Sequence, residues 1–301
     1  MSQHDIRTSD HTDGFFEDVH TQLRWGDLLL IATVPVILVG IYFLPRSTLE
    51  GLVFDTTAPS LLTAYTSHFV QLDGFHLLGN VTVYVPVVGM AYLLCILSDR
   101  RQLFRITFLT LVFVFPVALS AMQVIFPRER LIFGFSGINA GFVGLACFAL
   151  TGYLGKNISE RADDRYAPSL FFFAVGLIAL IGLPARAFRL EIGASSLALS
   201  VLYLGIGLYQ QGPPSKAEVK AAIDRPGYFE TAGAGFGLLA GYPFVAFQDA
   251  VVPDSGVLDV YVHILGFALA FIIVFIYVSV IRNEKQSAAN QASDGTEATP
   301  E

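Results

Sequence analysis

Eight long stretches without a charged side chain constrain the fold of this chain more than any other feature. A helix needs about 20 apolar residues to cross the hydrocarbon core of a bilayer, so several such stretches indicate a chain that folds within a membrane. They are Leu28–Pro45, Gly74–Ser98, Ile106–Pro127, Leu131–Gly155, Tyr166–Ala185, Ile192–Ser215, Thr231–Gln248 and Val260–Ile281. The pattern predicts an all-α, polytopic transmembrane helix bundle with about eight spans.

The seventh stretch is the least typical of the eight. Residues 231–237 are rich in glycine and poor in bulky side chains, and Pro243 interrupts the remainder. The stretch is either a full span or a re-entrant segment. We expect a span, because an even number of crossings then brings the eighth stretch into the membrane from the outside.

Composition agrees with a membrane protein and excludes several other classes. The chain has 301 residues, of which 54% are hydrophobic and 14% charged, and this is too apolar for an ordinary soluble domain. Cys95 and Cys147 both lie in apolar stretches, without the spacing of a disulfide framework or a zinc site, so we expect buried free thiols. The net charge of −7 argues against nucleic acid as a partner, and four lysines against fourteen arginines would suit a salt-rich cytoplasm.

Basic residues also predict the orientation in the membrane. With both termini inside, thirteen of the eighteen basic residues lie on the inner side and five on the outer side. Since cytoplasmic loops carry the excess of lysine and arginine, both termini are expected in the cytoplasm. We predict a multi-pass plasma-membrane protein with a polar N-terminal segment (1–26), a membrane domain (27–282) and a disordered tail (283–301). The first 26 residues have no apolar core of a cleavable signal peptide.

Four polar side chains are expected at one depth in this topology. The even-numbered stretches all enter from the outside, and His76, Asn80, Ser136 and His263 each follow an outer boundary by three to seven residues. At about 1.5 Å per helical residue, all four lie within roughly 5 to 10 Å of the outer surface. His76 and Asn80 are four apart and therefore share a helix face.

Each of these residues also has an ordinary structural interpretation. A serine among glycines is typical of close helix packing, an intramembrane asparagine often joins two helices, and a histidine near the boundary can be interfacial. Ionisable groups in a bilayer nevertheless tend to face a partner or a cavity, because exposure to lipid is costly. Their shared depth therefore favours a functional site.

The residue types suggest nucleophilic catalysis. A serine hydroxyl needs an adjacent base, for which neutral imidazole is the usual choice. We expect Ser136 to attack and His263 to act as the base. The backbone N–H of Ser136, the Asn80 amide and the His76 ring are the candidate donors to a developing oxyanion. Asp259, four residues before His263, either orients the imidazole or marks the membrane boundary.

These residues resemble the rhomboid intramembrane serine proteases. The family has a Gly-x-Ser-Gly motif, an earlier His-x-x-x-Asn motif and a histidine on the last core helix. The matching segments here occur in the same order and on the same membrane side: Gly134-Phe135-Ser136-Gly137, His76-Leu77-Leu78-Gly79-Asn80 and His263-Ile264-Leu265-Gly266. The resemblance covers roughly residues 28–281 and implies a rhomboid-like core. Ser136 would be the nucleophile and His263 the base, with His76, Asn80 and Gly134 around the oxyanion, and His68 looks like a histidine that often precedes the second motif.

The chain departs from the family pattern in three places. A family core has six spans with one helix between the serine and histidine helices, whereas three are expected here. Ala270 stands where a glycine is common, a change that should still permit close packing against Ala140 and Gly144. The Trp-Arg pair of the first outer loop is absent, because Trp25 is the only tryptophan.

The expected function is hydrolysis of a peptide bond in or near a transmembrane segment of another protein, without metal or cofactor. The partners are then transmembrane protein substrates and the lipid bilayer. One alternative is a non-catalytic rhomboid-like scaffold that binds membrane proteins. Another is a small-molecule transporter, which would need polar residues along a continuous path, and the inner halves of the spans contain almost none. The residues name neither the physiological substrate nor an oligomeric state.

Overall fold

The structure, a computed structural model, describes residues 12–126, 131–183, 188–247 and 260–296. It is almost entirely helical in these ranges. The elements in chain order are α1 (Thr12–Gln22), α2 (Trp25–Tyr42), α3 (Arg46–Leu52), β1 (Phe54–Asp55), α4 (Leu61–Thr66), η1 (Ser67–Phe69), α5 (Gly74–Leu97), α6 (Arg101–Phe113), α7 (Phe115–Ile125), β2 (Leu131–Ile132), α8 (Ser136–Asn157), η2 (Asp164–Tyr166), α9 (Ala167–Gly182), α10 (Arg189–Gln211), α11 (Lys216–Ile223), α12 (Tyr228–Ala246) and α13 (Val260–Thr296).

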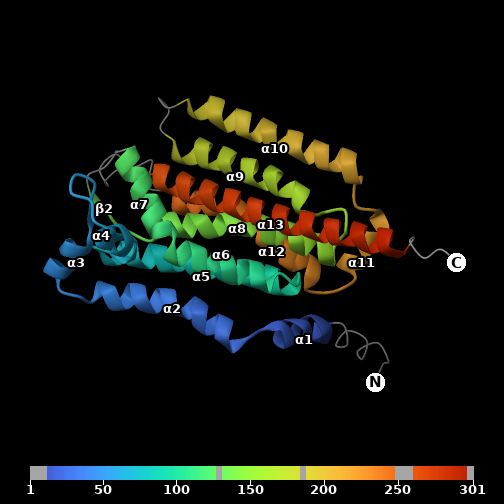
Figure 1. Ribbon diagram of the computed structural model, residues 1–301, viewed down its shortest axis with the longest axis horizontal. Coiled ribbons are helices and arrows are strands. Elements are labelled where there is room, and N and C mark those ends of the chain that lie inside the picture. The colour runs from blue at the N-terminus through green and yellow to red at the C-terminus, as the bar shows by residue number, and fades with distance from the viewer. Residues whose placement is uncertain (1–11, 127–130, 184–187, 248–259, 297–301) are drawn as a thin grey trace, which may run out of the picture.

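The long helices lie side by side as a bundle (Figure 1). Six helical segments in the described residues are long and apolar enough to cross a membrane, namely α2, α5, α8, η2 with α9, α10 and α13. The pair α6 and α7 makes a seventh if it is counted as one bent span. The predicted all-helical, polytopic membrane bundle is therefore confirmed at this level. Helix α12, the weak seventh stretch, is one continuous helix through Pro243 but is not among these six.

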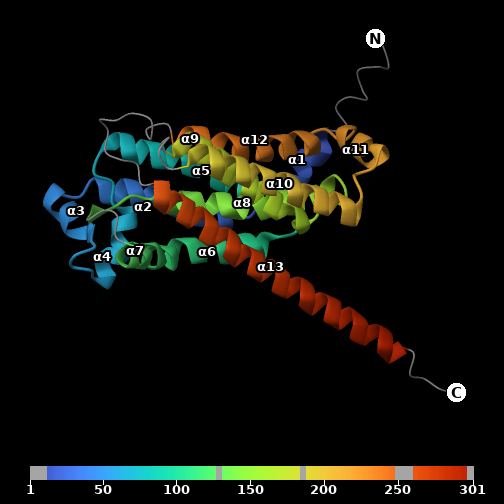
Figure 2. The same cartoon turned by 90° about the horizontal axis from the view of Figure 1, so that it is seen from above.

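Helices α5, α8 and α13 all begin at the same end of the bundle, where α3, α4 and β2 also lie (Figure 1). We call this the serine end, because Ser136 is the first residue of α8. Helices α1 and α11 lie at the opposite end, which we call the α11 end. Figure 2 shows that α13 crosses the bundle obliquely and extends beyond it at the α11 end.

Helix α8 occupies the centre of the bundle. In its most apolar window 94% of the residues are buried, compared with 22% for α10 and 17% for α2. Helices α5, α6, α7, α9, α12 and α13 pack around it, whereas α10 packs on the outer side of α9. The contact between α9 and α10 is close, because Gly176 and Gly193 each leave room for a leucine of the opposite helix. Ser136 is the first residue of this central helix.

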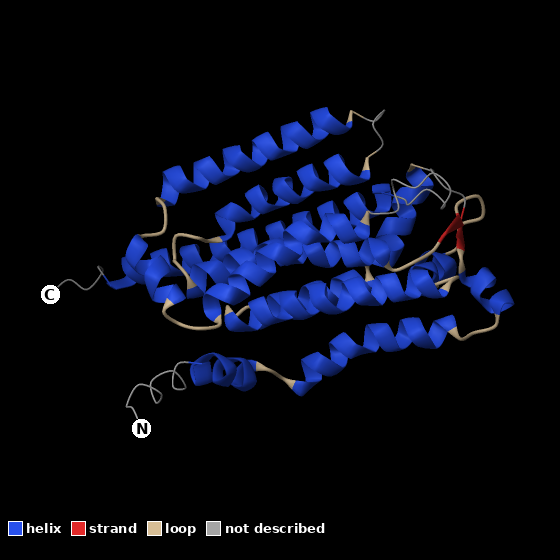
Figure 3. Cartoon of the chain, turned by 180° about the vertical axis from the view of Figure 1, so that it is seen from behind, coloured by secondary structure: helices blue, strands red, loops and turns tan. Residues whose placement is uncertain are grey.

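A small folded unit covers the serine end. Strands β1 and β2 form an antiparallel pair, with Phe54 opposite Ile132 and Asp55 opposite Leu131 (Figure 3). Strand β2 leads into the turn before α8, so this pairing ties the connection 46–73 to the turn. Leu49, Val53 and Val70 form a local apolar cluster beneath the unit.

One expectation from the sequence needs correction. The stretch Ile106–Pro127 was expected to be one span, but it lies in two helices that meet at an angle of 48°. The break falls at Val114, since Pro116 lacks an N–H and its ring would clash with the carbonyl of Val112 in a continuous helix. The backbone of α13 continues as a helix to Thr296, into the C-terminal segment 283–301 for which the sequence predicts disorder.

Candidate active site

The turn before Ser136 is shaped by Gly134. Its φ of +107° lies in a region that side-chain-bearing residues rarely adopt. Its N–H donates to the Ser67 carbonyl at 3.0 Å, which fixes the turn on η1. A Cβ at this position would lie 2.6 Å from Cε1 of His76, so the imidazole packs directly on the bare glycine. The first two motifs thus meet in space, as expected from their shared depth.

Helix α8 begins with two backbone N–H groups that have no acceptor within the helix. The N–H groups of Ile138 and Asn139 both donate to the Phe135 carbonyl at 3.0 Å, and these are the first bonds of the helix. The amides of Ser136 and Gly137 precede them and have no intrahelical acceptor. Together with the positive end of the helix dipole, they favour a negative charge beside Ser136.

Helices α8 and α13 cross at very short range at the serine end. A Cβ on Gly137 would lie 2.6 Å from Cγ1 of Val262, and a Cβ on Gly266 would collide with the Gly137 carbonyl. Only glycine permits this approach. Ser136 and His263 are the chain neighbours of Gly137 and Val262, so the contact brings them to the same crossing. Ser136 is partly exposed, whereas His263 is only 4% exposed.

The small residues expected along α8 continue this contact. A Cβ on Gly144 would lie 2.8 Å from the Phe267 carbonyl and 3.1 Å from Cβ of Ala270. Ala270 is therefore accommodated close to Gly144, as expected.

The His-x-x-x-Asn motif lies in the first two turns of α5. Asp73 caps this helix, and its Oδ1 accepts from the His76 N–H at 2.7 Å. Asn80 is 4% exposed, and its Nδ2 donates to Oε1 of Gln71 and to the His76 carbonyl, both at 3.1 Å. Both amide hydrogens of Asn80 are therefore engaged in this state, so a bond from Asn80 to an oxyanion requires one of these acceptors to be released.

Asn139 is a site residue that the sequence reasoning missed. Its Nδ2 donates to the Asn80 carbonyl at 3.0 Å and to Asn80 Oδ1 at 3.2 Å. It follows Ser136 by three residues and is only 3% exposed, so it links the serine helix to the Asn80 helix within the core. The signal was available in the sequence, because a buried polar residue one turn after Ser136 is uncommon in an apolar stretch.

His68 packs against the turn before Ser136. The Ser120 hydroxyl donates to the Ala64 carbonyl at 2.8 Å and lies 3.0 Å from Nε2 of His68. Because the hydroxyl hydrogen is already engaged, the N–H at Nε2 donates to the Ser120 oxygen. The ring also lies near the carbonyls of Pro116 and Gly134. Complete burial lowers the pKa of His68 to about 4, although these two carbonyls oppose the shift. His68 is thus a neutral structural group joining η1, α7 and the turn.

Several buried polar atoms beside this network have no hydrogen-bond partner within the described part of the chain. They are the hydroxyl of Ser67, Nδ1 of His68, Nε2 of Gln71 and Oδ1 of Asn139. All four belong to side chains around the turn or the Asn80 network. The serine end therefore has a polar layer beneath its surface.

The remaining candidates lie elsewhere. Asp259, the possible third member of a triad, falls outside the described residues. Cys95 and Cys147 are buried free thiols, as expected. In the ranges that the structure describes, no three side chains of the metal-binding types come together.

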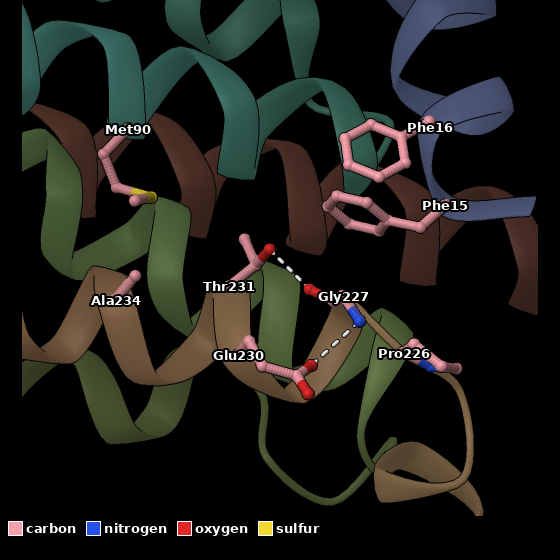
Figure 4. Close-up of a pocket in the computed structure, with 8 residues that line it drawn as sticks. All are labelled: Phe15, Phe16, Met90, Pro226, Gly227, Glu230, Thr231 and Ala234. Atoms are coloured by element: carbon pink, nitrogen blue, oxygen red, sulfur yellow. Dashed lines mark hydrogen bonds between the residues drawn. The ribbon is translucent and has the colours of Figure 1, made fainter. Parts of the chain in front are cut away.

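A cavity of about 290 Å³ lies at the α11 end, far from Ser136. Phe15, Phe16 and Met90 line one side of it, and residues around the start of α12 line the other (Figure 4). Glu230 in its wall caps α12 by accepting from the Gly227 N–H at 2.8 Å. Mostly apolar side chains line the cavity, and the four candidate catalytic residues are absent from its wall.

The chain was compared with protein-family models, with curated proteins and with solved structures, and none of the three comparisons found a match.

Proposed function

We propose that this chain is an intramembrane serine endopeptidase with a rhomboid-like core. The observation that carries the proposal is the meeting of three separate segments at the serine end. His76 packs on Gly134, two residues before Ser136, and the contact between Gly137 and Val262 joins Ser136 and His263 at one helix crossing. Helix packing alone requires the glycines, but it requires neither a serine at the helix start nor a histidine opposite.

The proposed reaction begins with attack of the Ser136 hydroxyl on a peptide carbonyl, while His263 accepts the hydroxyl proton. The carbonyl oxygen becomes negative and is stabilised by the amides of Ser136 and Gly137 and by His76. Asn80 joins them when its amide releases one of its two present acceptors. His263 then protonates the leaving amine, and a water molecule hydrolyses the acyl-enzyme by the same steps.

The proposed setting is a plasma membrane that the chain crosses about eight times, with both termini in the cytoplasm and the serine end towards the outside. The common starting end of α5, α8 and α13 supports this arrangement. The buried polar layer supports it as well, because hydrolysis needs water at a site flanked by lipid. Substrates are transmembrane proteins whose helix is locally weak, since a regular helix hides its carbonyls from a nucleophile.

The test uses purified protein in detergent or in vesicles with a model transmembrane substrate. The wild type is expected to cleave it, and Ser136→Ala and His263→Ala are expected to lower the rate by a factor on the order of 10³ or more. The matched controls are Ser195→Ala and His20→Ala, whose side chains are exposed on α10 and α1 and which should leave cleavage unchanged. Cleavage that survives Ser136→Ala or His263→Ala would remove the proposed pair. A folded wild type that cleaves none of several substrates would favour the non-catalytic scaffold.

A further inference from the structure

Phe247 lies against the proposed base. It follows the last residue of α12, and its N–H donates to the Pro243 carbonyl at 3.2 Å. Its side chain is fully buried, and its ring meets the His263 imidazole edge to face, with centroids 5.3 Å apart and an interplanar angle of 63°. One neighbour of the buried His263 imidazole is therefore an aromatic ring from the end of α12.

Two further contacts hold the Phe247 ring in place. The Tyr242 ring packs perpendicular to it at 6.2 Å, one turn earlier on α12. The second contact is with Gly182, the last residue of α9, where a Cβ would be 2.9 Å from Cδ1 of Phe247. Gly182 thus leaves the space that the ring occupies. Helices α9 and α12 both lie between α8 and α13 in the chain. The end of α9 contacts the end of α12 where the Phe247 ring packs on Gly182.

We infer that Phe247 positions His263 for catalysis, and that Gly182 at the end of α9 seats Phe247. The inference rests on the proposed function. An imidazole turns about two side-chain bonds, and its lone pair must point at the serine hydroxyl to accept a proton. A rigid aromatic neighbour with edge-to-face geometry restricts both rotations. Misplacement of a reacting group by about 1 Å lowers the rate by a factor on the order of 10².

Helices α9 and α10 take part in this positioning. In the described residues, helices α9 to α12 lie between the helices that carry Ser136 and His263, and α9 contributes the glycine against which the positioning ring packs. Helix α10 in turn holds α9, through reciprocal bonds in which the Ser169 and Ser200 hydroxyls each donate to the other residue's carbonyl, at 2.9 and 2.8 Å. The pair of α9 and α10 therefore supports Phe247 and, through its ring, the proposed base His263.

The experiment measures kcat and KM separately, together with the midpoint of thermal unfolding, for four single variants. Phe247→Leu keeps an apolar side chain but removes the ring, and Phe247→Tyr keeps the ring. Gly182→Ala places a methyl group where the ring lies. Phe244→Leu is the matched control, because Phe244 lies in the last turn of α12, three residues before Phe247, and is 53% exposed.

Phe247→Leu and Gly182→Ala are each expected to lower kcat by about tenfold to a hundredfold, with KM within about twofold of the wild type. Phe247→Tyr should recover most of the lost rate, and Phe244→Leu should behave as wild type. The double variant Gly182→Ala/Phe247→Leu should be no slower than Phe247→Leu alone, because both changes act through one ring.

An unchanged kcat in Phe247→Leu would overturn the inference while leaving the proposed function intact. A fall in kcat that comes with an equal loss of thermal stability, and that Phe247→Tyr shares, would show a merely structural role. A folded wild type without any cleavage would instead overturn the proposed function, and the positioning role with it.

Discussion

Gly134 illustrates at the scale of single residues how backbone geometry limits the site. Its positive φ and the His76 ring packed on it both exclude a side chain. Gly134→Ala is expected to lower the free energy of unfolding by about 1–3 kcal/mol and to lower activity at least tenfold, because the turn before Ser136 must shift.

The measurement is thermal unfolding and cleavage by the purified variant. The control is Gly79→Ala, since Gly79 is in α5 near the same depth and has open space around its Cα. A Gly134→Ala variant that is as stable and as active as Gly79→Ala would contradict the described geometry of the turn.

His68 makes stability depend on pH. Its folded-state pKa of about 4 lies below the ordinary value of 6.5, so the unfolded chain binds a proton that the folded chain excludes. The stability that a neutral His68 contributes is complete above about pH 6.5 and is lost as the pH falls from there to about 4. Since one pKa unit corresponds to about 1.4 kcal/mol, the loss approaches about 3 kcal/mol at the lower limit.

Thermal unfolding between pH 4 and pH 8 measures this dependence. The wild type should lose stability across that window more steeply than His68→Gln, which has no titrating group at the position but can still donate to Ser120. Parallel curves for the two proteins would show that the pKa of His68 is not lowered in the folded state.

At the scale of elements, the crossing of α8 and α13 depends on glycine. Alanine in an exposed helix interior is more stable than glycine by about 1 kcal/mol. Gly266→Ala should have the opposite sign and destabilise the fold by about 1–3 kcal/mol, because the added methyl group would collide with the Gly137 carbonyl and separate the two helices. Cleavage should be lost, since the crossing also brings Ser136 and His263 together.

Gly205→Ala is the matched control for this prediction. Gly205 lies within α10 with nothing near its Cα, so this variant should be unchanged or slightly more stable. Thermal unfolding of both variants measures the difference. Equal stability of the two would contradict the close approach of α8 and α13.

The elements could be predicted from the sequence where hydropathy alone determines them. The second stretch, Gly74–Ser98, corresponds to α5 within one residue, because Asp73 and Asp99 mark its limits. The hydropathy pattern does not predict the bend at Val114, because the apolar run continues across it and only Pro116 signals a break. The start of α8 at Ser136 was also obscured, because the apolar residues before it form β2 and a turn.

The sequence predicts the site residues only through their depth in the membrane. Depth placed His76, Ser136 and His263 in one layer, but it carries no information about rotation around each helix axis. Asn139 and Phe247 were therefore missed: the first faces Asn80 from within α8, and the second reaches His263 from the end of α12. Both contacts join residues more than ten positions apart in the chain and follow from tertiary packing.

The whole molecule has a polar layer at the α11 end as well as at the serine end. Asp27 of α2 is buried and joins three groups: its carboxylate accepts from Arg105 Nε at 2.6 Å and from the Tyr92 hydroxyl at 3.0 Å, and it lies 3.4 Å from Arg101 Nε. These bonds tie α2 to α5 and α6. Asp27→Asn is expected to lower the free energy of unfolding by about 1–3 kcal/mol, because two arginines lose their counter-ion while Arg105 keeps partial access to solvent.

The measurement is the free energy of unfolding of the wild type and of Asp27→Asn in detergent. Glu50→Gln is the control, because the pair of Glu50 with Arg46 is exposed on both sides and should contribute little. If both variants unfold like the wild type, the Asp27 group does not hold α2 to the bundle.

The proposed mechanism depends on the activation of Ser136 by His263. The most direct measurement is the reaction of the purified protein with a fluorophosphonate, which forms a covalent bond to an activated serine, followed by mass spectrometry of the peptides. The wild type is predicted to carry the adduct on Ser136, and His263→Ala to carry none under the same conditions although it is folded. Labelling of Ser136 at an equal rate in both proteins, or no labelling of Ser136 in the folded wild type, would contradict the claim.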